Sequence, residues 1–152
     1  MKKTLFVLLV LLGVTGVVLF WNRNHDDVEN RLFLEENEMK IEVVIHDQVL
    51  EGVLENTDSA RAFYQMLPLS LTMNELNGNE KYYYFSEDLP TQAYVPSGIQ
   101  TGDLMLYGSD CLVLFYDSFQ TSYRYTRLGK VNGEVAGLVG DGRVEVLFRI
   151  KE

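Results

Sequence analysis

Apolar and polar residues alternate along most of the chain after residue 38, which is typical of β-strands with one buried face. The alternation is clearest in Met39–His46 and in Arg143–Ile150. Further runs rich in strand-forming residues predict strands at Val49–Leu54, Leu67–Met73, Glu80–Phe85, Leu104–Tyr107, Cys111–Tyr116 and Tyr123–Leu128. About seven or eight short strands, without alternating helices, favour a closed barrel or a sandwich.

One segment carries its apolar residues at helical rather than strand spacing. Ser59–Met66 predicts a short helix, and one of the polar residues 56–58 can cap its start. Pro68 ends this helix, because the residue before a proline avoids the helical conformation. Val135–Val139 lies between two glycines and predicts one further helical turn.

The N-terminal segment has a different pattern. Lys2 and Lys3 precede the uncharged run Thr4–Phe20, and Trp21 stands where an interfacial aromatic residue would lie. As a helix the run rises about 25 Å, at the short end for crossing a bilayer. It lacks an A-x-A-like cleavage site, so we predict a transmembrane signal anchor at residues 1–21; a cleaved signal peptide is the alternative.

The charges around this segment predict where the rest of the chain lies. The two lysines should stay on the cytoplasmic side. Residues 22–38 then form an acidic linker, and residues 39–152 form one domain outside the cytoplasm. Cleavage would instead release that domain as a secreted protein.

Composition excludes several classes of function. The net charge of −9 and the lack of a basic patch argue against a nucleic-acid partner. Cys111 is the only cysteine, so no intrachain disulfide can form, and its apolar neighbours predict a buried, unreactive thiol. No phosphate loop, zinc-ligand spacing or dinucleotide motif is present, so we predict neither a cofactor nor a metal.

Three motifs occur in order along residues 39–150. They are NTDSARAFYQMLPLSLTMNELNGNEKYYYF, LPTQAYVPSGIQTGDLMLYGSDCLVLFY and TSYRYTRLGKV. With them this region resembles the bacterial cyclophilin-like domains of unknown function. The resemblance implies a mainly β fold: a closed eight-stranded β-barrel with one or two short helices.

The same resemblance raises the question of prolyl isomerase activity. In true cyclophilins an arginine in an F-H-R motif acts beside a proline pocket lined by Gln, Phe, Trp and His. After residue 38 this chain has no F-H-R motif, no Trp and only one His, His46. The catalytic set is therefore not carried over, although Arg124 or Arg127 could polarise an amide, and a divergent isomerase stays an alternative.

Tyrosines supply the candidate binding residues. Strand alternation would place Tyr123, Tyr125 and Arg127 on one face, which suits an anionic or peptide ligand. The simpler interpretation is that the tyrosines pack across strands and Arg127 pairs with an acidic residue. Asp103 is expected to cap a turn. The candidate ligand-binding residues are Tyr123, Tyr125, Arg127, Tyr116, Glu80 and Tyr82.

These patterns together favour a membrane-anchored binding module outside the cytoplasm. Its ligand would be a small molecule or an extended peptide in a groove lined by tyrosines. Two other classes stay open: an enzyme, and a structural partner in a complex of the cell envelope.

Overall fold

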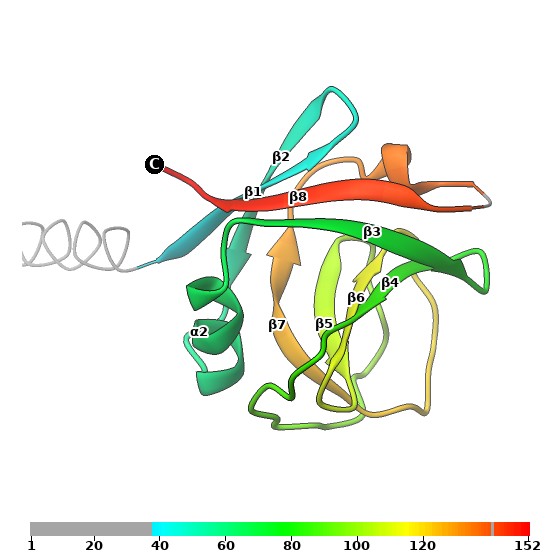
Figure 1. Ribbon diagram of the computed structural model, residues 1–152. Helices are drawn as coiled ribbons and strands as arrows, with labels where there is room; N and C mark the ends of the chain where they lie inside the picture. Colours follow the sequence, from blue (N-terminus) through cyan, green and yellow to red (C-terminus); the bar gives the residue numbers. More distant parts are fainter. Residues whose placement is uncertain (1–37, 141) are drawn as a thin grey trace, which may run out of the picture. The chain divides into compact units, whose positions relative to one another are not determined.

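The computed structural model describes residues 38–140 and 142–152. The strands are β1 (Met39–Ile45), β2 (Gln48–Leu54), β3 (Leu69–Leu76), β4 (Glu80–Tyr84), β5 (Asp103–Tyr107), β6 (Cys111–Phe115), β7 (Tyr125–Val131) and β8 (Val144–Ile150). They form a closed antiparallel barrel in the order β1-β2-β7-β5-β6-β4-β3-β8, and β8 pairs with β1 (Figure 1). The predicted mainly β, eight-stranded closed barrel is confirmed.

The expected anchor at 1–21 and all but the last residue of the linker at 22–38 lie outside the described residues. Within the described part of the chain, no helix is long and apolar enough to span a membrane.

The predicted helix is α2 (Asp58–Gln65), and its start follows from its capping residue. Thr57 has an extended backbone, and its side-chain oxygen accepts a hydrogen bond from the Ala60 amide at 3.2 Å. Phe63 lies on the buried side of α2 and packs edge-on against Phe148, with ring centroids 5.7 Å apart. The helix contacts β7 and β2. The predicted helical turn is the 3₁₀ helix η1 (Ala136–Leu138).

Strands β5 and β6 are buried on both faces. Leu104, Leu106, Leu112 and Leu114 point inward and belong to the barrel core. The residues between them point outward into a second buried cluster of Ile99, Met105, Cys111, Val113, Phe115 and Tyr125. This double burial explains why CLVLF shows no alternation in the sequence, since both faces of the strand are apolar.

Two connecting segments cover this outer cluster. The chain between β4 and β5 runs beside the chain between β6 and β7, because Ile99 and Phe119 exchange backbone hydrogen bonds of 2.8 and 3.2 Å. Tyr94 pairs in the same way with Tyr125 at the start of β7. The expected strand at residues 123–128 therefore begins two residues later, at Tyr125, and Tyr123 belongs to the covering loop.

Candidate functional site

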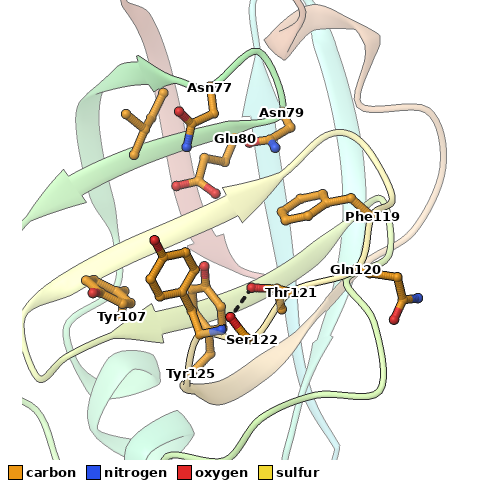
Figure 2. A pocket seen from close by; sticks show the side chains of 11 residues that line it. Asn77, Asn79, Glu80, Tyr107, Phe119, Gln120, Thr121, Ser122 and Tyr125 are labelled. Atoms are coloured by element: carbon orange, nitrogen blue, oxygen red, sulfur yellow. Dashed lines mark hydrogen bonds between the residues drawn. The ribbon is translucent and has the colours of Figure 1, made fainter.

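A pocket of about 390 Å³ opens at the edge of the covered outer cluster. One wall is the hairpin between β3 and β4, with Leu76, Asn77, Asn79 and Glu80. The other wall is Tyr107 at the end of β5 and the loop into β7, with residues 119–123 and Tyr125. Figure 2 shows the Glu80 side chain between the two walls, with Asn77 and Asn79 above it and Tyr107 and Tyr125 below.

Strand alternation places Glu80 in this pocket and turns its neighbour Lys81 away. Glu80 pairs with Phe115, whose side chain lies in the outer cluster. Lys81 pairs with Leu114, whose side chain lies in the barrel core, so the two charged side chains leave β4 on opposite faces. Glu80 is only 7% exposed. Its carboxylate makes no hydrogen bond or ion pair with any residue that the structure describes.

Burial without a partner changes the acid strength of Glu80. Desolvation, together with the nearby negative charge of Glu75, raises its pKa from 4.5 to about 7. A carboxyl group that titrates near neutral pH inside a pocket is a recurrent sign of a functional site. Glu80 is therefore the central residue of this candidate site.

On the inner face, Lys81 is fully engaged. Its ammonium group, in a side chain 2% exposed, binds Glu75 Oε2 at 2.5 Å and the carbonyl oxygens of Gly140 and Gly142 at 2.8 and 3.0 Å. Tyr116 donates a 2.8 Å hydrogen bond to the other oxygen of Glu75. Burial raises the pKa of Glu75, but the hydrogen bonds from Lys81, Tyr116 and the Gly78 amide outweigh it, and the net pKa is lowered.

Aromatic rings form a connected wall on the far side of the pocket. The ring centroids of Tyr107 and Tyr123 are 6.1 Å apart, with an angle of 89° between the ring planes. The centroids of Tyr107 and Tyr125 are 5.7 Å apart, with an angle of 52° between the planes. Tyr123 and Tyr107 are 63% and 45% exposed, so their rings are open to a ligand. Tyr125 is buried, and desolvation, with the charge of Glu80, raises its pKa to about 12.

Arg127 lies outside this pocket, in a separate depression with Glu55, Tyr94 and Thr126. Its guanidinium group binds Glu55 Oε1 at 3.1 Å and approaches Asp103 Oδ1 at 3.2 Å. Asp103 is fully buried, and its other oxygen accepts a 2.9 Å hydrogen bond from the Gln100 amide, which is the expected turn cap. Arg127 therefore pairs with acidic residues, as the simpler interpretation of the sequence expected.

The structure brings together only some of the candidate residues. Tyr123, Tyr125 and Glu80 line one pocket. Tyr116 is engaged with Glu75, and Tyr82 packs against the outer cluster and against Tyr84. Together with Arg127, these two residues are not among those that line the pocket.

Several pocket residues were missed in the sequence. They are Leu76, Asn77, Asn79, Tyr107 and the loop residues 119–122. The only signal for them was the turn sequence Asn77-Gly78-Asn79, which indicates a hairpin but not what faces it.

Cys111 behaves as predicted. It is a free, buried cysteine in the outer cluster, 4% exposed. Burial raises the pKa of its thiol to about 11, so the reactive thiolate is scarce at neutral pH. No group of residues that could hold a metal ion occurs among those described.

Comparisons with known proteins bear on the fold of this domain. The sequence model of the Cyclophilin-like family matches residues 43–150. The solution structure of the hypothetical protein AF2241 from Archaeoglobus fulgidus is similar, with a TM-score of 0.54 and 18% identity. The match covers 75% of this chain and 95% of that one, and at this identity it supports the fold alone. No curated protein matches the chain.

Glu80 predicts an unusual dependence of stability on pH. The folded state keeps the proton up to about pH 7, whereas the unfolded chain loses it near 4.5. The free energy of unfolding should therefore fall as the pH rises through this window, by about 3 kcal/mol in total. Glu80→Gln should abolish this fall, as measured by urea denaturation at about pH 4.5 and about pH 8. Glu87→Gln, at an exposed position, should retain it. An unchanged fall in Glu80→Gln would contradict the assignment.

The ion pair of Arg127 predicts a structural role for this residue. Arg127→Met leaves the buried Asp103 carboxylate with the Gln100 amide and with Lys130, 3.8 Å away, as the remaining cation, and should lower the free energy of unfolding by about 2–3 kcal/mol. Arg149→Met removes an exposed pair with Glu42 and should cost less than about 1 kcal/mol. Urea denaturation of both variants measures the difference, and equal losses would refute the structural role.

Proposed function

The chain belongs to the Cyclophilin-like family, and from this premise we propose that its barrel domain is a binding module that holds a small molecule in the pocket beside Glu80. One observation carries the proposal. Glu80, a residue that is only 7% exposed and whose carboxylate has no partner among the described residues, projects into a pocket that exposed tyrosine rings line. Such a group costs stability, so a ligand that satisfies it gains affinity.

The size of the pocket favours a small ligand over an extended peptide. About 390 Å³ lies at the lower end of the range for small-molecule sites, roughly 300–1,000 Å³. The other residues that would have extended the groove lie elsewhere. Tyr82 packs against the outer cluster, Tyr116 is hydrogen-bonded to Glu75, and Arg127 lies in the separate depression.

A prolyl isomerase would need an arginine available to polarise the amide. Arg127 is held by Glu55 and Asp103, and Arg124 donates a 2.5 Å hydrogen bond to the Ala93 carbonyl. Neither contact favours an isomerase over a binding module.

We further propose that the domain works outside the cytoplasm and is held at the membrane by residues 1–21. The proposal rests on the apolar run Thr4–Phe20, the preceding lysines and the lack of an A-x-A-like cleavage site.

The binding proposal is tested by filling the pocket. A fragment library is screened against the full chain by ligand-observed NMR, and Ser122→Trp, an exposed loop position on the pocket wall, should abolish binding of the hits. Ser86→Trp, an exposed position that is not part of this pocket, is the matched control and should bind normally. A screen without hits that depend on Ser122 would overturn the proposal.

The location of the domain outside the cytoplasm is tested by fusing alkaline phosphatase after Glu152, because this enzyme is active only after export. The full chain should give activity in the membrane fraction that resists a carbonate wash, and deletion of residues 4–20 should abolish it. Activity in the soluble fraction, with a new N-terminus on sequencing, would show cleavage and refute the anchor.

A further inference from the structure

We infer that the ligand of this pocket is a small organic cation, whose primary ammonium group is bound by Glu80 and by the surrounding tyrosine rings. The inference rests on the proposed binding function and specifies the chemistry of the ligand.

The buried polar groups that lack partners in the pocket are hydrogen-bond acceptors. The Glu80 carboxylate has no partner among residues 38–140 and 142–152. The side-chain oxygen of Asn79, on the same wall, is buried and also makes no hydrogen bond. The Asn79 oxygen has no surface open to a ligand, so Glu80 is the acceptor that a ligand can reach. A primary ammonium group offers it three N–H donors and a positive charge. Charge-assisted bonds of this kind are about twice as strong as neutral ones.

The described residues that line the pocket supply no positive charge to fill this need. The pocket has no lysine or arginine among its lining residues. Lys81, next to Glu80 in sequence, faces the barrel interior and binds Glu75 and two carbonyl oxygens. Arg127 is held in another depression by Glu55 and Asp103. When Glu80 is ionised, its counter-charge therefore has to come from the ligand.

The opposite wall suits a cation as well. Tyr107, Tyr123, Tyr125 and Phe119 line the pocket, and the first two are substantially exposed. Tyr107 and Tyr123 meet edge to face at 89°, and a bound ammonium group is attracted to a ring face that this contact leaves open. Figure 2 shows Glu80 directed from the hairpin toward this aromatic side.

Charge argues against the other classes of small ligand. An anion would meet the Glu80 carboxylate and the field of nearby Glu75. An uncharged apolar ligand would remove water from Glu80 and leave it unpaired, at a cost of several kcal/mol. The net charge of −9 also raises the local concentration of cations rather than anions.

The test compares three ligands of one shape: butylammonium, 1-butanol and butyrate. They are titrated into the full chain at about pH 8, where Glu80 is ionised, and binding is followed by NMR. Butylammonium should bind at least about tenfold tighter than 1-butanol, and butyrate should bind more weakly still. Glu80→Gln should weaken butylammonium by about tenfold or more. Glu87→Gln makes the same charge change at an exposed position and should have little effect.

A second pair of variants remains informative if Glu80→Gln fails to fold. Tyr123 lies in the covering loop and is 63% exposed, so its substitution should spare the fold. Tyr123→Leu should weaken butylammonium binding several-fold more than it weakens 1-butanol binding, and Tyr123→Phe, which keeps a ring, should weaken butylammonium less than Tyr123→Leu does.

The outcomes separate this inference from the binding proposal. Equal affinity for butylammonium and 1-butanol, or undiminished butylammonium binding in a folded Glu80→Gln variant, overturns the inference that the ligand is a cation. If Glu80→Gln does not fold, undiminished binding in Tyr123→Leu overturns it. If butylammonium fails to bind, and the fragments whose binding depends on Ser122 are neutral or anionic, the inference that the ligand is a cation is wrong and the binding proposal stands. If no such hit exists, both are wrong.

Discussion

Strands β5 and β6 have apolar side chains on both faces, and this double burial determines where a site can form. Their inward leucines fill the barrel, while the outward residues of the second cluster would be exposed without a cover. The chain before β5 and the chain before β7 provide that cover, joined by the backbone bonds between Ile99 and Phe119. The pocket lies where this cover meets the β3–β4 hairpin, so its walls come from segments about 40 residues apart in sequence.

The alternation of one strand then separates two opposite electrostatic environments. At the start of β4, the ammonium group of Lys81 is buried with a carboxylate, two carbonyl oxygens and no free hydrogen-bonding capacity. One residue earlier, on the outer face, the Glu80 carboxylate is almost as deeply buried without a partner that the structure describes. Because β-strand side chains alternate, neither residue can neutralise the other, although they are adjacent in the chain.

Local patterns in the sequence were sufficient for the barrel and insufficient for the site. Alternation in Met39–His46 and the capping signal before α2 each reflect contacts within a few residues, and both were predicted. The candidate face of Tyr123, Tyr125 and Arg127 was inferred by extending strand alternation two residues too far. Nothing in the sequence shows that Asn79 and residues 119–123 face each other, because that contact depends on the barrel order and on how the loops cover the outer cluster.

The buried state of Glu80 is the strongest physical reason to regard the pocket as functional. The raised pKa of Glu80 means that the folded domain is about 3 kcal/mol less stable above pH 7 than at low pH, a large part of the roughly 5–15 kcal/mol that stabilises a typical domain. Glutamine at this position would keep the shape and remove the cost. The other buried charges, Lys81 and Asp103, each lie within 4 Å of an opposite charge and do not carry this penalty alone. A carboxyl group kept at such a cost, facing open aromatic rings, is the observation on which the proposed binding of a ligand from solution rests.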